Sequence, residues 1–121
     1  MDNLYQEHIL DHARNPRNKG VLDNYDIKQD GSNPSCGDTM VLYLRINNNG
    51  SISRVLFDGE GCAISQAGAS LVSEYIKDMT LEEIKKITPE KVYKLFGVTP
   101  NPARQKCALL FLHTLFDAIK K

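Results

Sequence analysis

The fold is decided by residues 40–57, which read MVLYLRINNNGSISRVLF. Apolar and β-branched residues dominate both ends of this stretch and predict strands over residues 40–46 and 52–57. The Asn49-Gly50 pair between them is a strong signal for a tight hairpin turn. We therefore predict an antiparallel hairpin in the middle of the chain, with a short edge strand over residues 25–28.

The segments on both sides of this hairpin have the apolar spacing and the start signals of helices. The first predicted helix is ended by the Asn-Pro-Arg-Asn-Lys-Gly segment at residues 15–20. One continuous helix is predicted at the C-terminal end, with an apolar stripe from Ala108 to Ile119. The predicted class is α+β in a single domain, with helices over residues 2–14, 64–77, 80–86, 88–97 and 101–119.

Composition limits the classes of partner. The chain has 121 residues, and its 15 Lys and Arg equal its 15 Asp and Glu. A protein that recognises nucleic acid through phosphates normally has a basic face, which this balance does not favour. The longest apolar run, residues 108–112, is far shorter than a membrane span, and the first residues lack the pattern of a signal peptide. We expect a cytoplasmic protein without nucleic-acid or membrane partners.

The cysteines carry the chemistry. In a reducing cytosol, three cysteines are better explained as metal ligands or reactive thiols than as disulfides. Each lies where a tight turn, a helix N-terminus or a cationic neighbour favours a thiolate. They are Cys36 in Asn33-Pro34-Ser35-Cys36-Gly37-Asp38, Cys62 in Gly59-Glu60-Gly61-Cys62-Ala63-Ile64-Ser65, and Cys107 in Arg104-Gln105-Lys106-Cys107-Ala108-Leu109-Leu110.

Asp38 adds an oxygen ligand to this set. Gly37 allows a tight turn that aims the side chains of Cys36 and Asp38 at one point. If Cys62 and Cys107 meet them, three thiolates and one carboxylate carry four negative charges, which a Zn²⁺ ion or a [2Fe–2S]²⁺ unit would reduce to a net charge of minus two. An oxygen ligand is displaced more readily than a fourth cysteine, which suits metal or sulfur that comes and goes.

Simpler explanations stay open on residue type and spacing alone. A lone cysteine is more often a small buried apolar residue, and no pair of cysteines here has the C-x-x-C spacing of a zinc ribbon. His8 and His12 are four residues apart on the first predicted helix, but without an H-E-x-x-H pattern they are better explained by packing or solvation. We expect His113 at the surface, beside the apolar stripe.

These segments together resemble the U-type iron–sulfur cluster assembly family, which comprises the IscU and SufU proteins and the N-terminal domain of NifU. The resemblance runs from about Leu4 to Ile119 in the same order. The matching residues are Asp11-His12, Asn15-Pro16-Arg17-Asn18-Lys19-Gly20, Asn33-Pro34-Ser35-Cys36-Gly37-Asp38, Gly59-Glu60-Gly61-Cys62-Ala63-Ile64-Ser65, Ala69-Ser70, Arg104 and Lys106-Cys107-Ala108.

The resemblance implies an α+β fold with a three-stranded antiparallel sheet packed on helices. It implies a site made of Cys36, Asp38, Cys62 and Cys107 that binds a labile [2Fe–2S] cluster or iron, or Zn²⁺ as the resting or alternative metal. The implied partners are a pyridoxal-phosphate cysteine desulfurase, which supplies persulfide sulfur, and downstream apo iron–sulfur proteins or carriers.

Features of two branches of this family are mixed in the chain. Lys106 replaces the histidine that precedes the third cysteine in the IscU branch, and residues 98–104 replace the chaperone-recognition motif of that branch, so dedicated chaperone binding is not expected. The Arg-x-x-Cys pattern and residues 15–20 resemble the SufU branch, whose members hold Zn²⁺ and relay sulfur. The 44 residues between Cys62 and Cys107 are closer to the IscU spacing.

Three functional hypotheses follow. The first is an iron–sulfur scaffold in which Cys36 is the first persulfide acceptor, Cys107 is the alternative acceptor, and Arg104 neutralises charge or pairs with Asp38. The second is a Zn²⁺-dependent sulfurtransferase that relays sulfur without holding iron. The third is a structural zinc module that acts as an interaction domain.

Overall fold

One helix, a small sheet and then a series of helices follow one another along the chain, in the order that the sequence predicts. The computed structural model describes residues 3–34 and 37–120, with side chains from residue 7 onward. The elements are α1 (Asn3–Arg14), β1 (Ile27–Asn33), β2 (Asp38–Ile46), β3 (Ile52–Asp58), α2 (Ala63–Tyr75), α3 (Leu81–Ile84), α4 (Pro89–Phe96), α5 (Pro102–Ala108) and α6 (Leu110–Ile119). The predicted α+β class with a three-stranded antiparallel sheet is confirmed.

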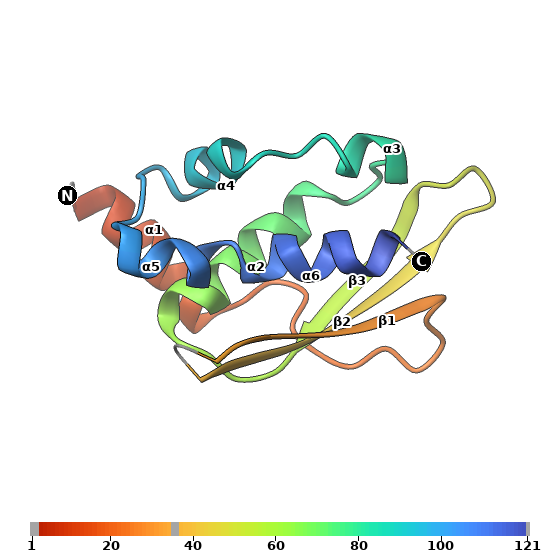
Figure 1. Cartoon of the computed structure of the whole chain (residues 1–121), viewed down its shortest axis with the longest axis horizontal. Coiled ribbons are helices and arrows are strands. Elements are labelled where there is room, and N and C mark those ends of the chain that lie inside the picture. Colours follow the sequence, from red (N-terminus) through yellow and green to blue (C-terminus); the bar gives the residue numbers. More distant parts are fainter. Residues whose placement is uncertain (1–2, 35–36, 121) are drawn as a thin grey trace.

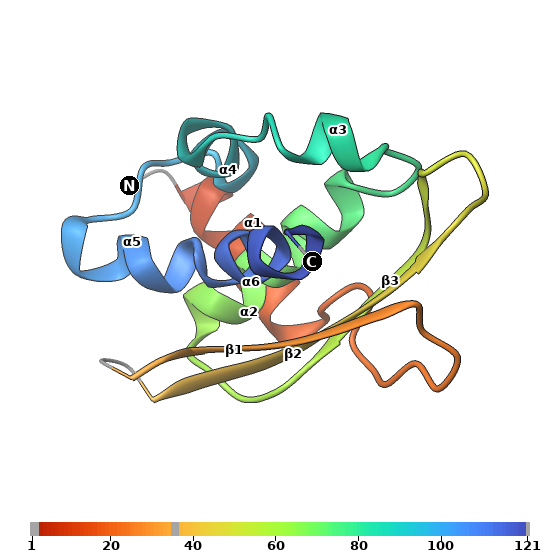
Figure 2. The same cartoon turned by 45° about the vertical axis from the view of Figure 1, so that its right-hand side comes forward.

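The sheet has the strand order β1-β2-β3, and both pairings are antiparallel. Helices α2 and α6 lie over one face of the sheet, and α3 and α4 lie beyond them, farther from the sheet (Figures 1 and 2). Along β2, Met40, Leu42 and Leu44 are buried against the helices. This alternation is typical of a strand with one face on the core.

The core forms where the sheet meets these two helices. Phe57 of β3 and Phe111 of α6 are fully buried, and their rings meet edge to face with centroids 5.9 Å apart. Val72 of α2 is fully buried in the same cluster. Aromatic pairs in this geometry stabilise a core by about 0.5–1.5 kcal/mol beyond the area that they bury. Buried aromatic and aliphatic side chains therefore pack the sheet against its helices.

The edge strand is longer than predicted and begins later. We expected residues 25–28, whereas β1 spans Ile27–Asn33 and pairs Asn33 with Asp38. The sequence of β1, IKQDGSN, has few strand-forming residues, so its pairing with β2 decides its conformation. β1 therefore ends at Asn33, and Asp38 opens β2 directly.

The predicted last helix is interrupted. Leu109, with φ −98° and ψ 0°, separates α5 from α6. Residues 107–112 are all buried, which a continuous helix with one exposed side does not allow, so tertiary packing overrides the helical pattern. The prediction of one continuous helix was wrong.

The predicted helix start signals at Thr80, Thr88 and Asn101 are confirmed. Thr80 and Glu83 form the reciprocal capping box, and the side chains of Thr88 and Asn101 cap α4 and α5. Gly97 ends α4 in the left-handed conformation at φ 82°. Among residues 3–34 and 37–120, no helix has the length and apolar character needed to cross a membrane.

Candidate metal centre

Three of the four predicted ligands meet at one end of the molecule. One ligand atom each from Asp38, Cys62 and Cys107 lies within 4.8 Å of the other two. They come from the start of β2, the residue before α2, and α5, which converge at this end (Figure 1). Cys36, the fourth predicted ligand, lies outside the described residues. Segments up to 69 residues apart along the chain thus place two sulfurs and a carboxylate together.

Asp38 has the environment expected of a ligand to a cation. Its side chain is only 2% exposed, and its Oδ1 accepts a hydrogen bond from the backbone N–H of Cys62 at 3.1 Å. Its Oδ2 is buried and has no hydrogen-bond partner among the described residues. Burying a carboxylate oxygen without a partner is costly. A metal ion fits because it would supply the missing positive partner.

The chain around Cys62 lets its amide approach Asp38. Cys62 is the N-cap of α2, with the extended values φ −71° and ψ 169°. The hydroxyl of Ser65, one turn later, donates to the carbonyl of Cys62 at 3.0 Å. A Cβ on Gly61 would overlap the Ser65 hydroxyl and lie 3.0 Å from Asp38 Oδ1. Only glycine leaves room at this position for the close approach.

Hydrogen bonds also join the segment before Cys62 to the rest of the site. The Thr39 amide, next to Asp38, donates to Glu60 O at 2.8 Å, and the Glu60 amide donates to Thr39 Oγ1 at 3.4 Å. Lys19 Nζ donates to Gly59 O at 2.8 Å and to Gln66 Oε1 at 2.9 Å. The Asn-Pro-Arg-Asn-Lys-Gly segment thus supports the loop that carries Cys62.

Cys107 is the most deeply buried of the described ligand candidates. It is 1% exposed and lies in the second turn of α5, the helix that Asn101 caps through a bond from Arg104 N to Asn101 Oδ1 of 3.1 Å. The side-chain amide of Asn33 donates to Cys107 Sγ, with an Nδ2–Sγ distance of 3.7 Å. Sequence reasoning assigned Asn33 no role; the available signal was its place in the segment that carries Cys36.

The cations near Cys107 in the sequence do not pack into the site. Arg104 and Lys106 are both exposed. Within residues 3–34 and 37–120, no ion pair joins Arg104 to Asp38. The role of Arg104 as a charge partner therefore stays a prediction.

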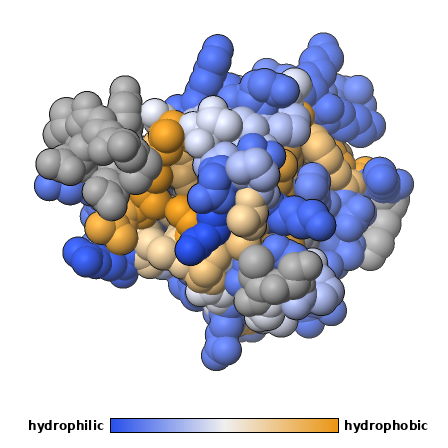
Figure 3. Space-filling view, turned by 60° about the vertical axis from the view of Figure 1, so that its left-hand side comes forward, coloured by the Kyte–Doolittle hydropathy of each residue, from blue (hydrophilic) through white to orange (hydrophobic). Residues whose placement is uncertain are grey.

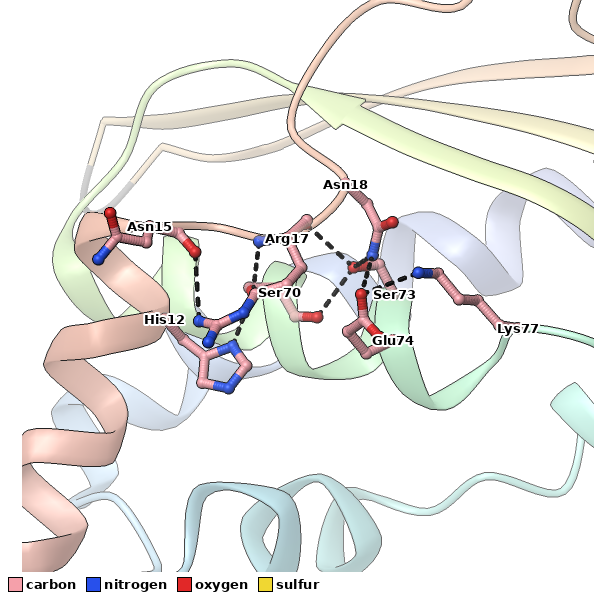
Figure 4. Close-up of polar contacts among 8 residues, drawn as sticks. All are labelled: His12, Asn15, Arg17, Asn18, Ser70, Ser73, Glu74 and Lys77. Atoms are coloured by element: carbon pink, nitrogen blue, oxygen red, sulfur yellow. Dashed lines mark hydrogen bonds and ion pairs between the residues drawn. The ribbon is translucent and has the colours of Figure 1, made fainter.

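The histidines behave as packing or surface residues. His12 of α1 is buried, and its Nδ1 lies 2.7 Å from the Ser70 hydroxyl on α2; this hydroxyl accepts a hydrogen bond from the Arg17 amide at 2.9 Å (Figure 4). Burial, helped by the positive charge of Arg17, lowers the pKa of His12 below its usual 6.5. His113 is exposed, as predicted.

A second exposed histidine completes this picture. His8 lies one turn before His12, and its Nε2 is 3.2 Å from the carbonyl oxygen of Leu95. The two histidine rings meet edge to face with centroids 4.9 Å apart. These contacts attach α1 to α2 and α4, in agreement with the packing interpretation.

Comparison with known proteins shows which family the sequence matches. The family model of the NifU-like N terminal domain matches residues 4–121. The zinc-dependent sulfurtransferase SufU of Bacillus subtilis is 36% identical, over 100% of this chain and 92% of that protein. The iron-sulfur cluster assembly scaffold protein IscU of Escherichia coli K12 is 40% identical, over 96% of this chain and 88% of that protein.

Solved structures give the same result for the fold. The crystal structure of FiSufU, described as an iron-sulfur cluster assembly scaffold protein for the SUF system of Fervidobacterium islandicum AW-1, superposes with a TM-score of 0.80. It is 31% identical and covers 93% of this chain and 94% of its own. The alignment with the Bacillus protein spans 138 positions, more than the 121 residues present here, so that protein has residues without a counterpart.

Proposed function

Because this chain belongs to the NifU-like N-terminal domain family, we propose that it is an iron–sulfur cluster assembly scaffold that accepts sulfur from a cysteine desulfurase. It then assembles a labile [2Fe–2S] cluster and transfers it to apo iron–sulfur proteins or carriers. The observation that carries the proposal is the group formed by Asp38, Cys62 and Cys107, whose ligand atoms lie within 4.8 Å of one another, together with the buried Oδ2 of Asp38, which has no hydrogen-bond partner among the described residues.

The proposed ligands are Cys36, Asp38, Cys62 and Cys107, with Cys36 assigned from its place in the sequence. A bound metal supplies positive charge that allows thiolates and a carboxylate to share one site. Asp38 is the ligand best suited to exchange, because carboxylate oxygen is a harder ligand than sulfur. Its Oδ1 bond to the Cys62 amide holds the side chain in place whether or not Oδ2 is bound.

Sulfur acceptance is an exchange between two sulfur atoms. The acceptor thiolate attacks the outer sulfur of the donor persulfide, the S–S bond of the donor breaks, and the donor cysteine leaves as a thiolate. Cys107 is buried, so a persulfide on another protein reaches its Sγ only if the structure around it moves. This burial supports Cys36 over Cys107 as the first acceptor.

The donor must approach the end of the molecule that carries the site. Figure 3 is turned toward this end, where the N-terminus lies, and shows apolar side chains between polar ones. Leu10 of α1 is one of the large apolar side chains exposed among the described residues, at 36%. A mixed surface of this kind suits transient docking of a protein.

Mass spectrometry after incubation with a cysteine desulfurase and cysteine tests the acceptor. The wild-type protein gains one sulfur, Cys107→Ser retains the gain, and Cys36→Ser loses it. Undiminished persulfide on Cys36→Ser would reject Cys36 as the acceptor. No added sulfur on the wild-type protein would reject the transfer itself.

A zinc-dependent sulfurtransferase is the second candidate. The identity of 36% to the Bacillus protein across the whole chain and the lysine at position 106 favour it. Anaerobic reconstitution with iron and sulfide separates the two candidates, because a [2Fe–2S] cluster absorbs visible light and Zn²⁺ does not. A colourless protein that retains zinc and stimulates the desulfurase would select the sulfurtransferase.

The structural zinc module makes different predictions. It expects the protein to unfold when a chelator removes the metal, and it expects no stimulation of a desulfurase. Stimulation that survives mild zinc exchange would exclude it.

A further inference from the structure

We infer that Asn33 is a positioning residue of the metal centre, which holds Cys107 Sγ as a permanent ligand and reduces its electron donation through an N–H···S hydrogen bond. This inference rests on the proposed function, since it takes Cys107 to be a ligand. Asn33 itself would not touch the metal and would act only through the sulfur.

The register of the sheet places Asn33 next to the candidate metal centre. It is the last residue of β1 and pairs with Asp38, the first residue of β2. Both residues are buried, at 7% and 2% exposed, and their side chains lie on the same face of the sheet as the pair two positions away, Gly31 and Met40. The paired ends of β1 and β2 therefore place a carboxylate and a neutral amide side by side.

The contact with Cys107 joins two distant segments. Asn33 Nδ2 lies 3.7 Å from Cys107 Sγ, the two residues are 74 positions apart, and both are buried. A buried amide needs a hydrogen-bond partner, and a thiolate can only accept hydrogen bonds. Asparagine is suited to this place because it donates without adding charge, whereas an aspartate would set a negative carboxylate against the sulfur.

Hydrogen bonds to ligand atoms orient them and tune the metal. Partners of this kind typically change metal affinity about 10–100-fold when they are removed, and hydrogen bonds to sulfur shift the properties of bound metal centres. A donor on the sulfur lowers the energy of its lone pairs, so less charge passes to the metal. The bond also fixes the position of the sulfur and stabilises its thiolate, so we expect Cys107 to be the anchored sulfur of the site.

Cys62 differs in this respect. It is half-buried, and no side-chain donor reaches its Sγ within the described parts of the chain. The two sulfurs therefore have unequal environments before any metal binds. Of the two sulfurs, this asymmetry makes Cys107 the one retained and Cys62 the one displaced more readily, while Asp38 stays the ligand best suited to exchange.

The test compares Asn33→Ala and Asn33→Leu with the matched control Ser32→Ala. Ser32 is exposed and lies on the opposite face of the same strand. Zinc affinity is measured by competition with a chromophoric chelator. The thiolate-to-metal charge-transfer band is recorded after loading with Co²⁺, and far-UV circular dichroism reports the fold.

We expect both Asn33 variants to lose zinc affinity by about 10–100-fold. Their Co²⁺ charge-transfer band should move to lower energy, because a sulfur without the hydrogen bond donates more charge. Ser32→Ala should match the wild-type protein in both measurements. A purely structural role for Asn33 would weaken binding without moving the band.

Three results would overturn the inference. The first is a folded Asn33 variant with wild-type affinity and an unshifted band. The second is weaker binding with an unshifted band. The third is loss of the native circular dichroism spectrum in both variants, which would give Asn33 a role in the whole fold. If wild-type protein bound Co²⁺ without a thiolate band, the proposed metal centre itself would fail, which separates the two failures.

Discussion

Replacement of Gly61 by alanine tests how closely the Cys62 loop is packed against the ligands. The new Cβ would overlap Ser65 Oγ and would lie 3.0 Å from Asp38 Oδ1. The backbone of Gly61 is outside the positive-φ region, so alanine can adopt its conformation without strain. The effect of the substitution therefore comes from the side chains that it contacts.

The expected cost follows from the bond that must break. Ser65 is 1% exposed, and its hydroxyl has to turn away from the carbonyl of Cys62, to which it donates at 3.0 Å. An unpaired buried hydroxyl costs about 1–3 kcal/mol. Alanine restricts the unfolded chain and returns about 0.4–1 kcal/mol. Taking the middle of each range, we expect Gly61→Ala to lower the free energy of unfolding by about 1.3 kcal/mol.

A double-mutant cycle with Ser65→Ala isolates the overlap. Urea unfolding of the metal-free protein is followed by circular dichroism for the wild-type protein, both single variants and the double variant. Removing Ser65 Oγ removes the overlap, so Gly61→Ala should cost less than about 0.5 kcal/mol in the Ser65→Ala background, a coupling of about 0.8 kcal/mol or more.

The same set of variants distinguishes an effect on folding stability from an effect on zinc binding. The contact with Asp38 remains in the double variant, so its zinc affinity should stay below that of Ser65→Ala. Equal costs of Gly61→Ala in the two backgrounds would refute the packing argument. Unchanged zinc affinity would refute the link between Gly61 and the position of Asp38.

Three further predictions follow from the same structure. Burial lowers the pKa of His12 in the folded protein, so as the pH falls the unfolded chain protonates His12 before the folded protein does. The stabilisation from neutral His12 is therefore complete above about pH 6.5 and is lost as the pH drops below this value. Urea unfolding at pH 7.5 and 5.5 should detect this loss in wild-type protein and in His113→Gln but not in His12→Gln. Replacing Asp38 by alanine should slow the loss of a reconstituted cluster to a chelator, followed by visible absorbance, if the carboxylate is the exchange route; equal or faster loss would identify Asp38 as an anchoring ligand. Asn101→Ala should cost about 1 kcal/mol and weaken zinc binding because it uncaps the helix of Cys107, whereas Thr88→Ala should cost a similar amount at unchanged zinc affinity; equal affinity in both variants would argue against this coupling.

Local signals were sufficient for most of the elements. The hairpin over residues 40–57 and the caps at Thr80, Thr88 and Asn101 depend on turn chemistry and on side chains a few residues away. Such interactions are present in the sequence itself, so β2, β3 and the helix starts could be predicted. Residue type and the family resemblance also predicted that Asp38, Cys62 and Cys107 share one site, together with Cys36, which lies outside the described residues.

Long-range packing decided the remaining features. The polar strand β1 forms because β2 pairs with it, and α5 ends at Ala108, before Leu109, because residues 107–112 are all buried. Neither feature follows from the hydrophobic periodicity of the neighbouring sequence, so sequence patterns could not predict it.

The sequence by itself determined which side chains can bind a soft metal and on which kinds of element they lie. Only the tertiary structure decided that Asn33 meets Cys107, that Asp38 keeps one buried oxygen without a partner among the described residues, and that the Cys62 amide holds the other. The physical reason is that strand register and helix packing set these contacts, and both join residues far apart in the chain.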